Sequence, residues 1–305
     1  MRPLLLPALL AIALATGCGG GSGDSADAVV SAVATTTQLG DYARAVGGRR
    51  VSVKQILPPN ADPHDYEPRP SDVLAIGDAS LVLQSGGDLD EWLGDLVESA
   101  GGDAKVVRVI ESVQTIDGED GAADPHWWQD PRNAVRAVEN VRDELIAADP
   151  GGRSAYTSNA ADYVEQLRRL DRFVAACIEQ IPEDQRKLVT THDALGYYAD
   201  RYGLEVVGAL IPSLSSQAQP SAKDTNALVE QIERLDVRAI FPESSLNPKL
   251  EEAVAREAGA EVGDALYADT LGPAGSSGTT YVGSIEANTR SIAEGLGGPE
   301  AKCSF

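Results

Sequence analysis

Ser154 to Ile181, SAYTSNAADYVEQLRRLDRFVAACIEQI, is the longest periodic segment of this 305-residue chain. Its apolar side chains recur at alternating intervals of four and three residues, with Arg, Asp, Glu and Gln between them. This spacing predicts an amphipathic helix of roughly 40 Å, which Pro182 ends. The segment occupies the middle of the chain, so we interpret it as a rigid spine between two lobes; the alternative is a helix packed on a single core.

On both sides of this segment, short apolar and β-branched runs alternate with helix-like stretches. The expected strands are 28–36, 51–57, 81–84, 105–110, 187–191, 205–211, 238–242 and 261–267. The longer helices are expected at 37–46, from Asp88 or Asp90 to 99, and at 131–148, 221–235, 247–258 and 281–296. This alternation is typical of a mainly parallel sheet covered by helices. We therefore predict an α/β fold of two lobes, 28–152 and 182–305, joined by one long helix, 153–181.

The first residues have the pattern of a processing signal. Arg2 precedes an apolar run from Leu4 to Leu14 that is too short to span a bilayer comfortably. The following Ala-Thr-Gly-Cys resembles a bacterial lipobox, which implies a signal peptide over 1–17 and lipid attachment at Cys18. The Gly- and Ser-rich stretch within 18–27 is interpreted as a flexible tether. The alternative is an ordinary secretory signal, and either interpretation places the mature protein outside the cytoplasm.

Charge and cysteine content narrow the class of protein further. With 25 basic and 47 acidic residues, the net charge of −22 disfavours nucleic acid and anionic lipid head groups as partners. Cys177 and Cys303 are the cysteines that remain after Cys18. In an oxidising compartment they can form a disulfide, but their positions in the sequence do not determine whether they meet.

The chain has three histidines, and all of them are next to or near aspartates. His64 lies in LPPNADPHDYEPRP (57–70), His126 in DPHWWQDP (124–131) and His192 in TTHDALGYY (190–198). Each follows a predicted strand, and so does Asp269. Ligands of parallel α/β sheets gather at the carboxyl ends of strands, so these residues are expected to meet in the cleft between the lobes. Three imidazoles and one carboxylate suit zinc, whereas calcium and magnesium prefer oxygen ligands.

Neighbouring acidic residues have two interpretations each. Asp62, Asp124 and Asp193 are candidates to accept a hydrogen bond from the second ring nitrogen of a ligating histidine, or to cap turns. Glu243, at another strand end, is the alternative fourth ligand.

Several segments together resemble the periplasmic or lipoprotein metal-binding components of zinc and manganese ABC importers. These segments are NADPHDYEPRPSDV, DPHWWQDPRNA, THDALGYYADRYGL, FPESSLNPK, LYADTLG and TYVGSIEANT, in this order along nearly the whole mature chain. The resemblance implies two α/β lobes joined by one long helix, with the metal held between them by His64, His126, His192 and Asp269. His192 resembles the zinc branch, since manganese-binding relatives often carry an acidic residue there. In contrast to many zinc-branch members, residues 112–125 contain no histidine, and Gln219 replaces the usual Glu.

These observations predict a monomeric, lipid-anchored receptor that binds zinc as cargo and delivers it to an ABC permease in the membrane. The alternatives are a manganese or iron receptor of the same architecture, a secreted zinc hydrolase, and a cell-adhesion protein in which the metal is structural.

Overall fold

The computed structural model describes residues 28–118, 121–298, 301 and 303. The predicted signal peptide, the tether and Cys18 lie outside these residues. Among the described helices, none combines the length and the apolar character that crossing a membrane requires.

The first lobe is built on a parallel sheet of four strands in the order β2-β1-β3-β4. The strands are β1 (Val30–Ala34), β2 (Val51–Gln55), β3 (Leu81–Gln84) and β4 (Lys105–Arg108). Successive side chains of a strand point to opposite faces. Ala32 and Leu83 therefore join the core beneath α1 (Thr37–Gly47) and α4 (Pro131–Ala148) on one face. Val33 and Val82 join the core beneath α2 (Pro70–Gly77) and α3 (Leu93–Ala100) on the other face. Both faces are buried, as expected for a parallel sheet.

The second lobe has the equivalent strand order, but its backbone pairing is less continuous. Its strands are β5 (Lys187–His192), β6 (Glu205–Ile211), β7 (Ala239–Ile240) and β8 (Glu261–Val262). β5 pairs with β6 and β7 with β8. A single parallel bridge at Thr190–Phe241 connects the two pairs, and a bridge at Glu243–Leu266 extends the pairing of the β7 and β8 segments. The resulting order is β6-β5-β7-β8. The helices are α6 (Gly196–Tyr202), α7 (Ala222–Leu235), α8 (Lys249–Ala258) and α9 (Tyr281–Gly297).

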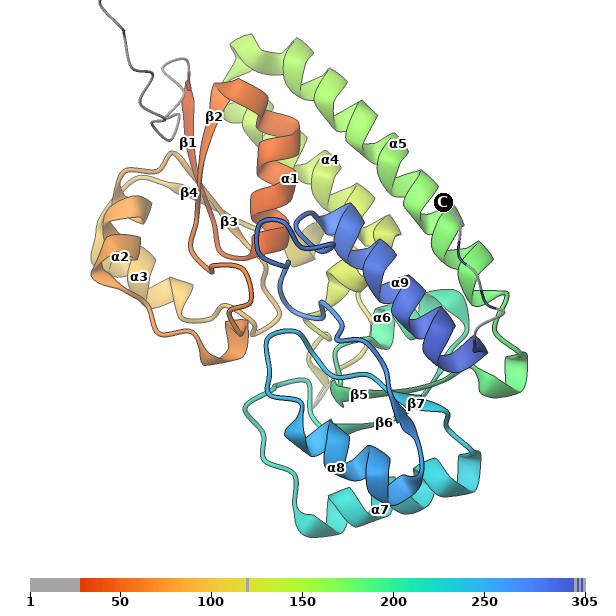
Figure 1. Cartoon of the computed structure of the whole chain (residues 1–305). Helices are drawn as coiled ribbons and strands as arrows, with labels where there is room; N and C mark the ends of the chain where they lie inside the picture. The colour runs from red at the N-terminus through yellow and green to blue at the C-terminus, as the bar shows by residue number, and fades with distance from the viewer. Residues whose placement is uncertain (1–27, 119–120, 299–300, 302, 304–305) are drawn as a thin grey trace, which may run out of the picture.

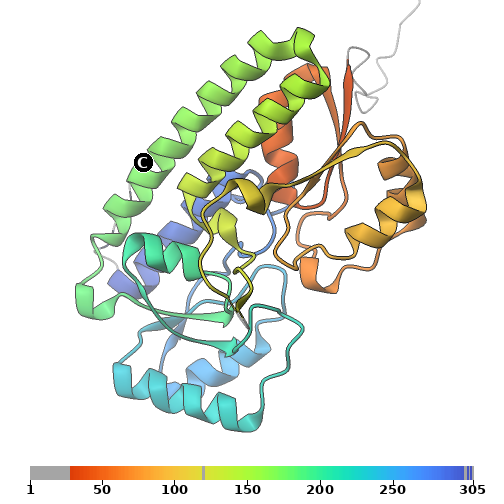
Figure 2. The same cartoon turned by 180° about the vertical axis from the view of Figure 1, so that it is seen from behind.

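The long helix α5 (Arg153–Ile178) runs along both lobes (Figure 1). It packs on α1 and α4 of the first lobe and on α6 and α9 at the other end. Seen from behind, α5 and α4 run side by side along the first lobe (Figure 2). The buried face of α5, which includes Leu167, Leu170 and Val174, belongs to one apolar cluster that contains residues of both lobes. The two lobes are therefore joined by a continuous core along α5, and the predicted α/β fold with a connecting helix is confirmed.

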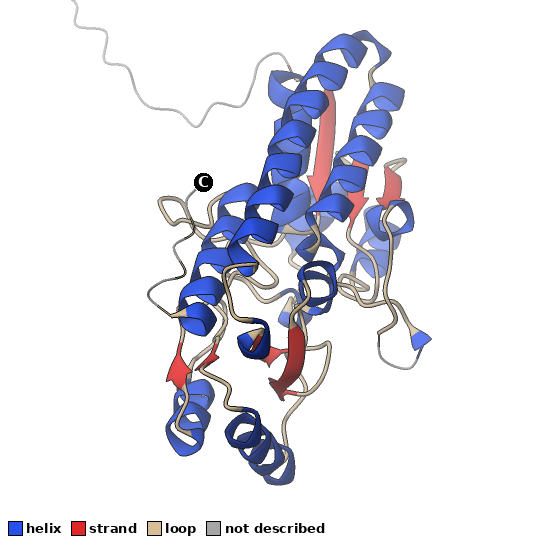
Figure 3. Ribbon diagram, turned by 90° about the vertical axis from the view of Figure 1, so that its right-hand side faces the viewer, coloured by secondary structure: helices blue, strands red, loops and turns tan. Residues whose placement is uncertain are grey.

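Turns of 3₁₀ helix complete the connections. They are Gly48–Arg50, Pro63–Asp65, Val109–Ser112, Trp127–Gln129, Pro150–Gly152 and Glu183–Gln185. Figure 3 shows the helices arranged around the short strands of both lobes.

Several local expectations differ from the structure. The helix expected from Asp88 or Asp90 begins at Leu93, because the buried carboxylate of Asp90 accepts hydrogen bonds from the backbone of Ser85 and Gly86 and so shapes a turn. The strands expected over 238–242 and 261–267 contain two residues each, and the short helix α6 was not predicted. The capping interaction expected at Ser221 is present: its side chain and that of Asp224 accept each other's backbone N–H.

Cys177, near the end of α5, and Cys303 form a disulfide, with their Cα atoms 5.3 Å apart. This bond connects the long helix to the C-terminal segment that follows α9. Cys177 is buried in the shared core, and Cys303 packs against that core.

Candidate metal centre

The four residues predicted as metal ligands lie together between the lobes. One donor atom from each of His64, His126, His192 and Asp269 lies within 4.8 Å of the others. The Nε2 atoms of His64 and His192 are 3.4 and 3.3 Å from Oδ2 of Asp269, and Nε2 of His126 is 3.5 Å from Oδ1. The Nε2 atoms of His126 and His192 are 3.4 Å apart. The three imidazoles thus point one nitrogen each at the same carboxylate.

Different structural elements bring these side chains together. His64 lies in the Pro63–Asp65 turn after β2, and His192 is the last residue of β5. Asp269 follows β8. His126 differs from the expectation, because a long connection separates it from β4 and it directly precedes the Trp127–Gln129 turn and α4.

One carboxylate in each lobe holds a histidine by two hydrogen bonds. Oδ1 of Asp124 is 2.8 Å from both the backbone N and the ring Nδ1 of His126. Oε1 of Glu243 is 3.0 Å from the backbone N and 2.5 Å from Nδ1 of His192. In both cases Nδ1 is the donor position and Nε2 is left facing Asp269, which is how a carboxylate fixes the tautomer of a ligating histidine. Glu243 therefore lies behind His192, on the far side of the ring from Asp269.

The other two predicted acceptors are placed differently. Asp62 accepts from the backbone N of His64 at 2.9 Å rather than from its ring. The backbone N–H of Asp193 donates to the carbonyl of Ser213 at 3.1 Å.

Asp269 is held in place by side chains of the first lobe. Gln38 Nε2 donates to its carbonyl at 3.0 Å, and Trp128 and Gln129 donate to the carbonyl of Ala268 at 2.9 and 2.6 Å. The backbone N of Leu271 donates to the hydroxyl of Thr37 at 2.9 Å. Sequence reasoning did not identify these contacts; the polar pair Thr37-Gln38 directly after an apolar strand was the available signal.

A supporting contact reaches Asp124 from α6. The Tyr197 hydroxyl donates to the backbone carbonyl of Asp124 at 2.7 Å, and burial raises the pKa of Tyr197 to about 12. Gly196 leaves room there, since a Cβ atom on it would lie 3.0 Å from Oδ2 of Asp124. Trp128 also lies edge-on to the ring of His126, with 5.5 Å between ring centres. Together these groups fix the orientation of His126.

The site is buried and strongly charged. His126 and His192 are fully buried, and Asp269 is 3% exposed. Burial alone would raise the pKa of Asp269, but the three imidazoles outweigh it and lower that pKa well below its ordinary value. Burial likewise opposes protonation of His192, yet Asp269 and Glu243 raise the pKa of His192 well above its ordinary value. Among the described residues, Nε2 of His64 and Oδ1 of Asp269 have no hydrogen-bond partner, which is unusual for buried polar atoms and is consistent with a candidate cation site.

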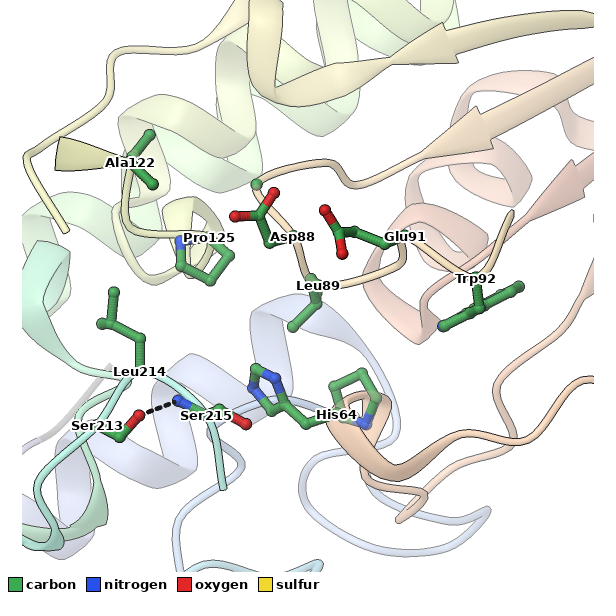
Figure 4. A pocket seen from close by; sticks show the side chains of 13 residues that line it. His64, Asp88, Leu89, Glu91, Trp92, Ala122, Pro125, Ser213, Leu214 and Ser215 are labelled. Atoms are coloured by element: carbon green, nitrogen blue, oxygen red, sulfur yellow. Dashed lines mark hydrogen bonds between the residues drawn. The ribbon is translucent and has the colours of Figure 1, made fainter. Parts of the chain in front are cut away.

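A cavity of about 410 Å³ lies beside His64. It is lined by Asp88, Leu89, Glu91 and Trp92 of the first lobe and by Ser213, Leu214 and Ser215 of the second (Figure 4). His64 is the member of the four-residue cluster that lines this cavity. Solvent therefore comes nearest to the site at His64.

Comparisons with known proteins agree with this geometry. A family model described as the periplasmic component A of a zinc-uptake complex matches residues 32–295. The chain is 34% identical over 292 residues to the manganese-binding lipoprotein MntA of Halalkalibacterium halodurans, which covers 94% of this chain and 96% of that protein. It is 30% identical over 289 residues to the metal ABC transporter substrate-binding lipoprotein FimA of Streptococcus parasanguinis, over 92% and 93% of the two chains.

A solved structure shares the fold over nearly its whole length. The periplasmic zinc-binding protein TroA from Treponema pallidum matches with a TM-score of 0.83 and 32% identity, over 88% of this chain and 99% of that one. The chain thus belongs to the family of periplasmic component A proteins of zinc-uptake complexes, which are extracytoplasmic metal-binding receptors of ABC importers and not enzymes.

Proposed function

We propose that this protein is a zinc receptor, which binds Zn²⁺ through His64, His126, His192 and Asp269 and delivers it to the permease of an ABC importer. The observation that carries this proposal is the spacing of the donor atoms. Ligands ~2.1 Å from a tetrahedral ion lie ~3.4 Å apart. Three separations between an imidazole nitrogen and a carboxylate oxygen, and one between the Nε2 atoms of His126 and His192, lie between 3.3 and 3.5 Å and agree with that value.

The donor set also favours zinc over harder ions. Three neutral imidazoles and one carboxylate are typical of zinc, whereas manganese prefers more oxygen ligands. Asp124 and Glu243 support metal binding at this site, because each keeps the Nε2 lone pair of its histidine directed at the ion.

Manganese is the second candidate, and one observation favours it. Both oxygens of Asp269 face imidazole nitrogens, Oδ2 toward His64 and His192 and Oδ1 toward His126. The carboxylate can therefore supply two ligand atoms, and a coordination number above four suits manganese or iron(II) better than a closed tetrahedral zinc site.

The remaining parts of the proposal concern how the receptor is held. We infer that cleavage after residue 17 exposes Cys18 for lipid attachment, that residues 18–27 act as the tether, and that lobes 28–152 and 182–305 are joined by the segment 153–181. The receptor functions as a monomer, since the four ligands come from one chain.

Competitive calorimetry on chelator-stripped protein tests the cargo. Zinc should bind one to one and displace manganese and iron(II), and His192→Asp should shift the preference toward manganese because it replaces an imidazole with a carboxylate. Wild-type protein that prefers manganese would reverse the assignment. Protein that loses its fold without metal would instead support a structural metal, as in the adhesion alternative.

A further inference from the structure

His64 is held less firmly than the other two histidines. His126 and His192 each have a carboxylate on both the backbone N and the ring Nδ1. Within the part of the chain that the structure describes, Nδ1 of His64 has no such carboxylate partner, and Asp62 contacts only its backbone N, at 2.9 Å. His64 also lines the cavity between the lobes. Of the three imidazoles, it is the one best placed to leave the metal first.

The carboxylate of Asp62 bridges the two lobes. Its Oδ1 accepts from the backbone N of His64, while its Oδ2 accepts from the hydroxyl of Ser216 at 2.6 Å and from Gln217 Nε2 at 3.4 Å. Ser216 and Gln217 lie in the loop between β6 and α7 of the second lobe. One side chain therefore fixes the turn that carries His64 and joins it to the opposite lobe.

The partner of Asp62 is a buried group. Ser216 is only 8% exposed, although it lies in a loop. The same loop supplies Ser213, Leu214 and Ser215 to the wall of the cavity beside His64 (Figure 4). If the lobes separated at this point, the same movement would break the Asp62–Ser216 hydrogen bond and widen the cavity.

The other end of the His64 loop is attached elsewhere. The backbone N of Asn60 donates to the carbonyl of Leu271 at 3.2 Å and to the hydroxyl of Thr270 at 3.1 Å. These acceptors adjoin Asp269. When the Ser216 contact breaks, the loop can therefore loosen at Asp62 and His64 while it stays attached beside Asp269.

We propose that Asp62 and Ser216 form an inter-lobe latch that keeps His64 on the metal, so that its opening sets the rate of metal release. The inference rests on the proposed receptor function, but it concerns the rate of release and not the identity of the ligands. Ser216 is in this view a positioning residue, because it acts on His64 through Asp62.

The test measures zinc release to an excess of chelator by stopped flow. A hydrogen bond to a charged acceptor typically contributes enough for about a tenfold effect, so Ser216→Ala should release zinc about ten times faster than the wild type. The rate of zinc association and the absorption spectrum of the cobalt(II)-loaded protein should not change, because all four ligands remain. Ser216→Thr, which keeps the hydroxyl, should restore slow release.

Ser215→Ala is the matched control. Its hydroxyl accepts from the backbone N of Gln217 at 3.3 Å within the loop, so its loss should leave the release rate unchanged. Equal release rates in the Ser215 and Ser216 variants would refute the latch, and so would an altered cobalt spectrum in Ser216→Ala. His64→Ala is measured alongside: if it keeps wild-type zinc affinity, the proposed site itself is wrong, independently of the latch.

Discussion

The two lobes have the same strand order but differ in regularity. The first lobe has four strands of four or five residues in one sheet, whereas in the second lobe only β5 and β6 are long, and β7 and β8 contain two residues each. In the second sheet the single bridge Thr190–Phe241 connects the β5-β6 pair to the β7-β8 pair, and the bridge Glu243–Leu266 extends the latter pair. Its cohesion therefore depends more on side-chain packing and on α5 than on backbone pairing.

The same contrast appears in how the ligands are held. By position in the sequence, each lobe contributes two of the four proposed ligands. The hydrogen bonds, however, connect Asp269 to the first lobe. Gln38 donates to the carbonyl of Asp269, and Trp128 and Gln129 donate to the carbonyl of its neighbour Ala268. His192, with Glu243 behind it, is then the ligand that depends on the second lobe alone. The first lobe thus forms most of the site, and the second completes it.

The largest expected effect comes from removing one ligand of each lobe. His126→Ala and His192→Ala should each lower zinc affinity by more than the roughly 10- to 100-fold that loss of a partner outside the ligand shell causes. Calorimetry of chelator-stripped protein measures this. If only one of the two variants loses affinity, the lobes do not share the site.

Loss of the disulfide should affect the second lobe more than the first. Cys303→Ser removes a crosslink between residues 126 positions apart in the sequence, which should lower the free energy of unfolding by about 2–4 kcal/mol. Because the second sheet has fewer backbone pairs, hydrogen exchange should quicken over β5–β8 more than over β1–β4. Uniform change in both lobes would contradict the proposed difference in cohesion.

The two orienting carboxylates allow a matched comparison. Asp124→Asn and Glu243→Gln should each reduce zinc affinity about 10- to 100-fold, because each replaces the charged acceptor that fixes the tautomer of its histidine with a neutral amide that can also donate. Asp193→Asn, next to the same ligand as Glu243, should have little effect, since Glu243 already occupies Nδ1 of His192. A loss at Asp193 as large as at Glu243 would reassign the orienting role.

The pH dependence should be the smallest effect over one pH unit. The neighbouring carboxylates of Asp269 and Glu243 outweigh burial and raise the pKa of His192 in the folded state. Protonation of His192 therefore stabilises the metal-free folded protein, fully so below the unfolded-state pKa of ~6.5. This stabilisation is lost as the pH rises through the raised pKa. Zinc needs the neutral ring, so its affinity should increase with pH by up to about tenfold per unit for each proton released. The zinc-induced rise in Tm should thus be larger at pH 8 than at pH 5.5, and equal rises would argue against ligation by His192.

Local patterns were sufficient for much of the fold. The period of the Ser154–Ile181 segment predicted α5, and apolar runs predicted β3 and β6 with their observed bounds. They failed where a distant contact determines the backbone, as at Asp90, whose carboxylate binds the backbone of Ser85 and Gly86 and the hydroxyl of Thr35 in place of starting a helix.

The sequence by itself determined the chemistry available to this protein: three histidines and an aspartate, two on either side of one long helix in the chain, of which His126 alone does not follow a strand closely. Only the tertiary structure decided how they are arranged. The 3.3 to 3.5 Å spacing, the choice of Glu243 over Asp193 behind His192, and the attachment of Asp269 to Gln38 all join residues far apart in the chain. The physical reason is that periodicity reports the face on which a side chain lies, whereas the partner it meets across the cleft depends on how the two lobes pack along α5.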